Sequence, residues 1–109
     1  MTKLNKYFYY LTILEKSNKE FDLEGVDVLL LNFIAKADHK KQTLNVKDLL
    51  LLKEIASQAT IHGRLKQLVA KKLIVLNEDK VDGRVKEVVL TKLAHKRYEV
   101  LSKAIEGKT

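Results

Sequence analysis

The chain of 109 residues contains no cysteine, proline or tryptophan and has only four glycines. The absence of cysteine excludes disulfides, thiolate zinc sites, iron–sulfur clusters and cysteine nucleophiles. Aliphatic runs reach only four residues, far short of the roughly eighteen that a membrane-spanning helix needs. The first residues lack the apolar core of a secretory signal. We therefore expect a cytoplasmic protein with a single hydrophobic core, which is what a chain of this length can bury.

Acidic residues are scarce in the second half of the chain. Residues 1–54 carry nine basic and eight acidic side chains, whereas residues 55–109 carry twelve basic and six acidic. This imbalance favours a polyanionic partner such as nucleic acid, although lysine-rich surfaces also serve solubility alone.

Apolar residues recur at helical spacing near both ends of the chain. They predict a helix over residues 4–16 and another over residues 92–106, which Gly107 ends. The first helix is apolar on more than one face and so needs more than one neighbour. A second copy of the chain would supply one, but a local core could also use all of its tyrosines.

A second helix is expected after a polar turn at residues 17–21. Asp22 is the predicted cap of this helix, which ends at residues 38–41, where cations suit a helix C-terminus. The side chains expected on its buried side are Leu23, Val26, Leu30, Phe33, Ile34 and Ala37.

Two further helices and a hairpin follow. Asn45 and Ser57 are typical caps, and the short helices after them form a predicted helix-turn-helix over residues 45–72. Two valine-rich β-prone segments around the Asp82-Gly83 turn predict a β-hairpin over residues 73–91. The inward residues expected on the fourth helix are Ile61, Leu65, Leu68 and Val69.

The outer face of this fourth helix, residues 57–72, is small and polar and carries no acidic residue. Small residues let a backbone approach a DNA groove, polar side chains reach base edges, and carboxylates would be repelled by phosphate. Gly63 in mid-helix costs about 1 kcal/mol relative to alanine, which argues against a merely solvated face. We expect Thr60, Gly63, Lys66 and Gln67 to contact bases closely, and Ser57, Gln58, His62 and Arg64 to contact the DNA backbone.

Three cations lie at or beside the hairpin tip: Lys80, Arg84 and Lys86. An arginine on a β tip can enter a narrow minor groove, where the potential is most negative. Arg84 could equally pair with Asp82 or Asp79 at the surface.

The hairpin residues Asp82-Gly83-Arg84-Val85-Lys86-Glu87-Val88-Val89-Leu90-Thr91 fit the pattern D-x-R-x-x-x-V-x-L-T. This pattern resembles the wing of MarR-type winged-helix transcriptional regulators, and the short chain is similar to their SarA-like single-domain form. The segment from Ser57 to Leu68, followed by Lys71-Lys72-Leu73-Ile74, looks like the family's recognition helix. The sequence departs from the family at Lys72 and Ala94, where glycine is usual.

The resemblance implies an α+β, mainly α fold: a winged helix-turn-helix with flanking dimerisation helices. Residues 1–109 would form one domain, with helix-turn-helix 45–72, wing 73–91 and dimerisation helices 1–20 and 92–109. The recognition helix would enter the major groove and Arg84 the minor groove. The residues expected at the dimer interface are Leu4, Tyr7, Phe8, Leu11, Leu101 and Ile105.

No catalytic or metal-binding pattern is present. His39, His62 and His95 lie in three different elements without metal-ligand spacing, so we expect no metal and no cofactor. The sequence lacks a G-x-S-x-G elbow, a Walker loop and an H-E-x-x-H motif. We expect no enzymatic activity.

The sequence thus predicts a homodimeric transcriptional regulator that reads an inverted repeat in double-stranded DNA. The alternative is a winged-helix interaction module that binds an acidic protein partner, because fold does not fix function. A membrane partner is not expected, since the basic helix lacks an exposed bulky apolar face. The sequence leaves open whether a small-molecule effector binds.

Overall fold

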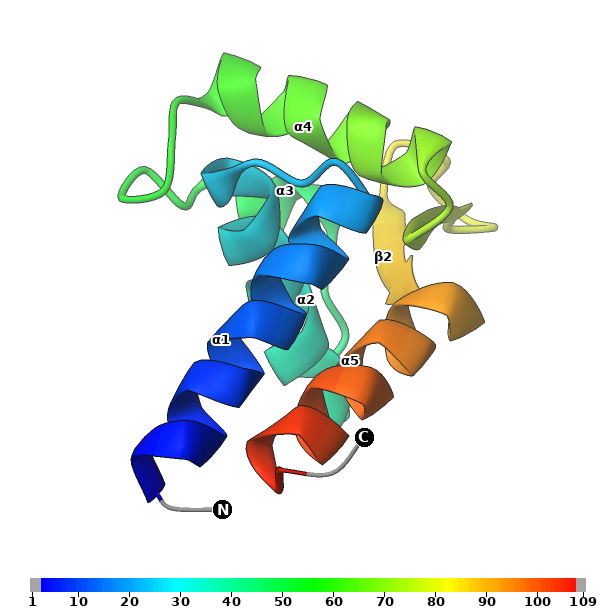
Figure 1. Ribbon diagram of the computed structural model, residues 1–109. Helices are drawn as coiled ribbons and strands as arrows, with labels where there is room; N and C mark the ends of the chain where they lie inside the picture. The colour runs from blue at the N-terminus through cyan, green and yellow to red at the C-terminus, as the bar shows by residue number, and fades with distance from the viewer. Residues whose placement is uncertain (1–2, 108–109) are drawn as a thin grey trace.

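Two helices from opposite ends of the chain lie side by side and extend away from the remaining elements (Figure 1). They are α1 (Lys3–Glu20) and α5 (Lys92–Ile105) in the computed structural model, which describes residues 3–107. The predicted dimerisation helices span residues 1–20 and 92–109. Residues 1–2 of the first and 108–109 of the second lie outside the described part. Within that part, no helix is both long and apolar enough to span a membrane.

The first helix is longer than its sequence pattern indicates. The predicted turn at residues 17–21 is wrong up to Glu20, because α1 continues through this polar segment. Ser17 is small enough to be buried, and α1 packs on α5. The helix ends before Asp22, whose φ of 53° lies in the left-handed region.

The second helix, α2 (Gly25–His39), begins later than the sequence predicts. Glu24, not Asp22, is its cap, and the backbone N–H of Glu24 donates to Asp27 Oδ2 at 2.8 Å. Its expected buried side is largely confirmed, because Leu30, Ile34 and Ala37 are buried. The prediction that Phe33 is buried is wrong, because its side chain is exposed.

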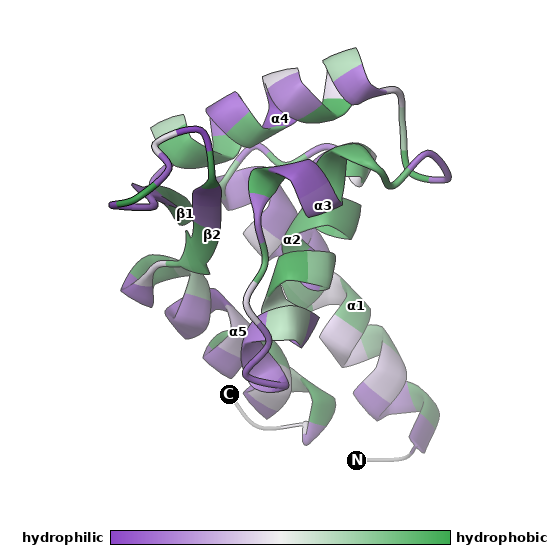
Figure 2. Ribbon diagram, turned by 180° about the vertical axis from the view of Figure 1, so that it is seen from behind, coloured by the Kyte–Doolittle hydropathy of each residue, from purple (hydrophilic) through white to green (hydrophobic). Residues whose placement is uncertain are grey.

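The helix-turn-helix consists of α3 (Val46–Leu50) and α4 (Gln58–Ala70), capped by Asn45 and Ser57 as expected. The inward positions of α4 are confirmed except for Val69, which is partly exposed. Figure 2 places the hydrophobic residues of α2 and α3 beneath α4. The core is formed by α2, α3, α4 and the hairpin, and includes Leu30, Leu31, Ile34, Leu49, Ile61, Leu68, Leu73 and Ile74.

The antiparallel hairpin consists of β1 (Ile74–Glu78) and β2 (Lys86–Leu90), with Ile74 paired to Leu90 and Glu78 to Lys86. Its base is fixed to both neighbouring helices. The Thr91 hydroxyl donates to the Lys72 carbonyl at 2.7 Å and accepts the N–H of Ala94, so it caps α5. Thr91 therefore joins the end of the hairpin to the segment after α4 and to the start of α5.

Lys72 connects α4 to the hairpin with a φ of 63°. This left-handed conformation favours glycine. It explains why glycine suits the position in the family that the sequence resembles. Gly107, with a φ of 76°, likewise ends α5 as expected.

Candidate nucleic-acid interface

Helix α4 lies across one end of the molecule, opposite the free ends of α1 and α5 (Figure 1). The residues of α4 predicted to contact DNA are exposed except for Arg64, and the buried side of the helix packs on α2 and α3. We define the outer face of α4 as the exposed residues Gln58, Ala59, Thr60, His62, Gly63, Lys66, Gln67 and Ala70.

Gly63 faces open space. A Cβ atom built at this position would meet no heavy atom within 4 Å. Packing inside the protein therefore does not require glycine here, although glycine weakens a helix by about 1 kcal/mol relative to alanine. A glycine on this exposed face would let the backbone of another molecule approach closely.

The N-terminus of α4 is organised by its own cap. The Ser57 hydroxyl accepts the N–H of Thr60 at 3.2 Å and donates to Thr60 Oγ1 at 3.0 Å. The first turn contains no acidic residue. Its remaining N–H groups and the helix dipole give this end a positive potential that suits phosphate.

Arg64 is not on the outer face. Its Nε donates to Asp27 Oδ1 at 2.7 Å and its Nη2 donates to Asp27 Oδ2 at 2.6 Å, with Glu24 3.6 Å from Nη1. This correction to the predicted DNA-contact set has a clear cause: Asp27 is fully buried and needs a counter-ion. Arg64 therefore fastens α4 to α2.

Asp27 stays ionised in this environment. Burial alone raises the pKa of the Asp27 carboxyl, but the hydrogen bonds from Arg64 and from the Glu24 backbone, together with nearby positive charge, outweigh it. The net effect holds the pKa below its usual value. A second contact strengthens the junction, since Lys71 Nζ donates to the Asp22 carbonyl. Sequence reasoning missed Asp27 because an acidic residue in the first turn of a helix is ordinary.

The hairpin tip is shaped by two aspartates. Asp79 Oδ1 accepts the N–H groups of Val81 and Asp82, at 2.7 and 3.1 Å. Asp82 Oδ1 accepts the backbone N–H of Arg84 and also its Nε, at 3.0 and 3.1 Å. The hydrogen bond from the Arg84 side chain lowers the pKa of Asp82, and backbone hydrogen bonds lower that of Asp79. The predicted surface pairing of Arg84 with Asp82 is therefore confirmed.

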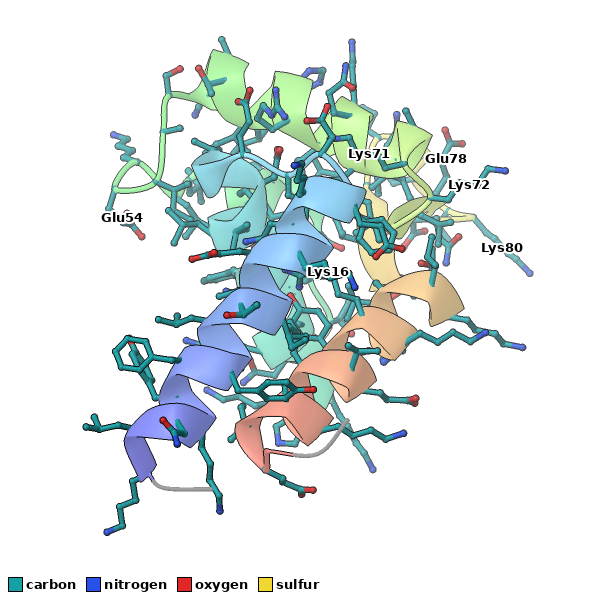
Figure 3. All side chains as sticks on the ribbon, viewed as in Figure 1. Lys16, Glu54, Lys71, Lys72, Glu78 and Lys80 are labelled. Carbon is teal, nitrogen blue, oxygen red and sulfur yellow. The ribbon has the colours of Figure 1, made fainter. Side chains whose placement is uncertain are left out.

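The tip cations are nevertheless accessible. The Arg84 side chain is 92% exposed despite its pairing, and Lys80 and Lys86 are exposed as well. Lys72 and Lys80 extend outward near the C-terminal end of α4 (Figure 3). The exposed cations Lys80, Arg84 and Lys86 thus lie on the hairpin that follows α4, together with four acidic residues, so the hairpin as a whole carries no excess of positive charge.

The expected dimer residues divide into two groups. Leu4, Tyr7, Phe8 and Ile105 are exposed in the single chain and Leu11 is half-buried, so these five can contact a partner. Leu101 is only 6% exposed, and its prediction as an interface residue needs correction. A side chain already buried within the chain has almost no area left to bury against a second copy.

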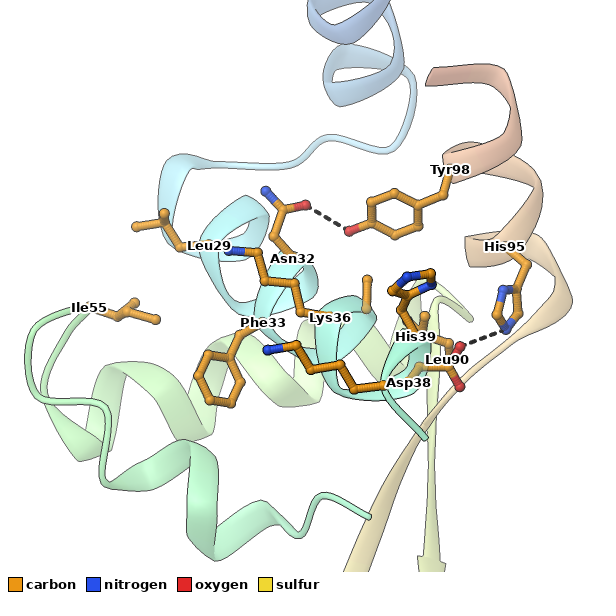
Figure 4. Close-up of a pocket in the computed structure, with 12 residues that line it drawn as sticks. Leu29, Asn32, Phe33, Lys36, Asp38, His39, Ile55, Leu90, His95 and Tyr98 are labelled. Atoms are coloured by element: carbon orange, nitrogen blue, oxygen red, sulfur yellow. Dashed lines mark hydrogen bonds and ion pairs between the residues drawn. The ribbon is translucent and has the colours of Figure 1, made fainter. Parts of the chain in front are cut away.

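The three histidines do not come together at one place. His62 lies on the outer face of α4, whereas His39 and His95 line a hollow of about 750 Å³ between α2 and α5 (Figure 4). Within residues 3–107 no group of three or more histidine or acidic side chains could hold a metal ion.

Comparison with known proteins identifies the fold. No protein-family model matches the chain, and no curated protein matches it either. Solved structures do match. The structure of a MepR–DNA complex from S. aureus agrees with a TM-score of 0.71 at 21% identity, over 88% of this chain and 69% of that chain. The chain has the winged-helix fold of the MarR-family regulators.

Two other similar structures show the same fold. Reduced AbfR bound to DNA has a TM-score of 0.64 at 18% identity, over 95% of this chain and 72% of that chain. The heme sensor PefR from Streptococcus agalactiae has a TM-score of 0.62 at 23% identity, over 95% of this chain and 74% of that chain. The winged-helix fold predicted from the hairpin motif is thereby confirmed. In this winged helix, the β1–β2 hairpin is the wing and α4 is the second helix of the helix-turn-helix.

Proposed function

We propose that this winged-helix protein binds double-stranded DNA sequence-specifically, as a homodimeric transcriptional regulator. One observation carries the proposal: the outer face of α4 is exposed, small, polar and free of carboxylates, and the wing beside it presents the exposed cations Lys80, Arg84 and Lys86. A helix of this kind fits the major groove, where base edges are distinguishable. Two of the similar structures, those of MepR and AbfR, are complexes with DNA, which supports the same partner here.

The side chains at this surface are assigned to two kinds of contact, one with bases and one with phosphates. Thr60, Gly63, Lys66 and Gln67 are assigned to close or base-edge contacts. Ser57, Gln58 and His62, together with the first-turn N–H groups, are assigned to phosphates. Arg64 is assigned a positioning role, because Asp27 occupies its guanidinium.

The wing is assigned to the neighbouring minor groove. Arg84 would exchange Asp82 for the negative potential of that groove, and Lys80 and Lys86 would contact phosphate. Because two copies would each present one α4 and one wing, the preferred site is an inverted repeat with half-sites about one helical turn apart.

Gly63→Ala is expected to change stability and DNA binding in opposite directions. The methyl group points into open space, so unfolding should cost up to about 1 kcal/mol more. On DNA the same methyl would hold the backbone away from the groove and weaken binding at least about fivefold, or roughly 1 kcal/mol. Chemical denaturation and fluorescence anisotropy on duplex DNA measure the two effects.

Gly25→Ala is the matched control. Gly25 is also helical and also faces open space, but it begins α2 and lies off the outer face of α4. It should not weaken DNA binding. Equal DNA affinity of the Gly63→Ala and parent proteins would mean that α4 does not approach a groove.

Gln67→Ala is expected to relax the preference at one base position. A glutamine amide can bond adenine with two hydrogen bonds, and such a contact discriminates by about 1–3 kcal/mol. Competition between duplexes that differ at single positions measures this change. An unaltered preference at every position would remove Gln67 from the readout.

Arg84→Ala is expected to weaken binding to all duplexes alike and to reduce the salt slope by about one unit, because one phosphate-region cation is lost. Lys103→Ala removes the same charge from an exposed position in the last turn of α5, and this end of α5 lies far from α4 in Figure 1. It should leave the slope unchanged. Identical slopes for both variants would show that the wing does not contact DNA.

A further inference from the structure

Four side chains join three helices in a continuous line of contacts. Arg97 of α5 donates from Nη2 to Asn18 Oδ1 of α1 at 2.7 Å, and its guanidinium carbon lies 5.1 Å from the centre of the Tyr98 ring. The Tyr98 hydroxyl in turn donates to Asn32 Oδ1 of α2 at 2.8 Å (Figure 4). We call these four residues the bridge, because they connect α1 and α5 to α2.

The bridge joins two parts of the molecule. We define the arm as α1 and α5, which pack on each other and extend away from the core (Figure 1). Between α5 and α2 lies the hollow of about 750 Å³, so close packing of apolar side chains does not fix the arm to α2 at this place. Polar contacts across the hollow therefore bear directly on the angle of the arm.

Arg97 is placed where a contact that served stability alone would not need a charge. It is 3% exposed, yet its Nε and Nη1 have no hydrogen-bond partner within the described residues. None of the ion pairs found there includes it. Arginine is always charged, and an apolar side chain of similar size in place of a buried ion is often neutral or stabilising. Buried polar groups can instead specify one arrangement of the elements around them.

Tyr98 carries the constraint across the hollow. Burial raises the pKa of its hydroxyl, and the nearby charge of Arg97 opposes this effect only in part. The hydroxyl therefore stays protonated and remains a donor to Asn32. The other contact across the hollow, between His95 Nε2 and Asp38 Oδ2 at 3.6 Å, joins two side chains that are about half exposed. Solvent screening makes that contact the weaker of the two.

The bridge ends on the helix that holds α4. Asn32 lies in α2, and Asp27 of the same helix accepts two hydrogen bonds from Arg64 of α4. Asn32 and Asp27 are only about one and a half turns apart, so α2 joins the bridge to α4. A tilt of the arm relative to α2 is therefore also a tilt relative to α4.

We propose that Arg97 and Tyr98 are positioning residues that fix the angle between the arm and the core. In the proposed dimer, in which the arms join the two copies, this angle sets the distance between the two α4 helices. The bridge thereby selects the spacing of the two half-sites. The statement about half-site spacing rests on the proposed function, whereas the statement about the angle concerns the single chain.

The absence of cysteine permits a direct measurement of the angle. Spin labels at Lys66→Cys of α4 and Lys103→Cys of α5, both exposed positions, report the distance between core and arm by double electron–electron resonance. An excess of unlabelled chain restricts the signal to pairs within one chain. The parent should give one narrow distance distribution. Tyr98→Phe and Arg97→Met should each populate other arm positions at least about fivefold more, as the loss of one hydrogen bond implies.

Matched variants separate positioning from stabilisation. Tyr7→Phe removes a hydroxyl from an exposed ring of α1, and Lys96→Met removes an exposed cation beside Arg97, so neither should change the distribution. Arg97→Met should broaden the distribution without lowering the urea midpoint, because it removes a buried charge that lacks an anionic partner. If Arg97→Met fails to fold, Tyr98→Phe still decides.

The spacing is tested with the inverted repeat that the parent selects and with the same repeat lengthened by one central base pair. The added pair moves the half-sites about 3.4 Å apart and turns them by about 35°. The parent should bind the lengthened duplex at least about tenfold more weakly. Tyr98→Phe should reduce this discrimination at least about threefold, and Tyr7→Phe should retain it.

Two outcomes would overturn the proposal. Parental distance distributions in both Tyr98→Phe and Arg97→Met would show that the bridge does not fix the arm. A broadened distribution with parental discrimination between the two duplexes would remove the link to half-site spacing. If the parent selects no repeat, the proposed function and this link fail together, while the distance measurement still decides whether the bridge fixes the angle.

Discussion

Asp27→Ala is expected to lower the free energy of unfolding by about 3 kcal/mol, which for a domain of this size lowers Tm by roughly 12 °C or more. The variant leaves Arg64 without the two hydrogen bonds that join α4 to α2, at 2.7 and 2.6 Å. This loss of stability is at the low end of the range for breaking a buried ion pair, because the Arg64 side chain keeps 24% of its surface exposed. Urea denaturation followed by circular dichroism measures it.

Two comparisons sharpen this result. Glu24→Gln removes an exposed carboxylate 3.6 Å from the same guanidinium and should cost less than about 1 kcal/mol. The double variant Asp27→Ala/Arg64→Met should recover part of the loss, since it removes the unpaired cation as well. A loss below about 1 kcal/mol for Asp27→Ala would contradict the assigned role of the pair.

The same pair predicts an acid dependence. The pKa of Asp27 is lowered in the folded protein, so its contribution to stability is fully present above the unfolded value of about 4. It is lost as the pH falls through the lower, folded value. The parent should therefore lose stability on acidification more steeply than Asp27→Ala, and the two unfolding curves should converge at low pH.

Phe8→Asp is expected to break the proposed homodimer. Phe8 is 58% exposed in α1 and stacks edge-on with Tyr7 at 5.5 Å between ring centres, which is an apolar surface without cover in the single chain. A symmetric interface loses the residue twice, at about 1.5 kcal/mol or more per copy, and each new carboxylate would be buried without a partner. The dissociation constant should rise at least about 100-fold.

Sedimentation velocity over a concentration series measures this change. Asn77→Asp adds the same charge to an exposed residue of the wing and should leave the dimer intact. Unchanged circular dichroism of Phe8→Asp would show that the chain itself remains folded. A dimer of parental strength in Phe8→Asp would place the interface elsewhere.

Signals that are local in sequence predict most of the fold. The caps Asn45 and Ser57, the Asp82-Gly83 turn and the change from helical to alternating periodicity locate the helix-turn-helix and the wing. Each depends on residues within a few positions of one another. The exposed outer face of α4 follows from the same periodicity, because a helix with one apolar side has a solvent side opposite it.

Contacts between distant residues account for what the sequence does not predict. The sequence alone predicts that Arg64 is a surface cation. In the fold it pairs with Asp27 of α2, which lies 37 positions earlier in the chain. Ser17 reads as a turn residue, yet it is buried in a helix that packs on α5. Leu101 was expected at the interface because the periodicity of the sequence shows only that it lies on an apolar face. Periodicity does not show whether that face is buried within the chain or against a second copy.

Two copies of the chain are proposed to read one DNA sequence through α4 and the wing. Selection from random duplex DNA with the purified protein, at about 150 mM salt where phosphate-only binding is weak, tests it most directly. We expect recovery of an inverted repeat with half-sites about one helical turn apart. Recovery of no common sequence, with only salt-sensitive binding, would contradict it and favour an acidic protein as the partner.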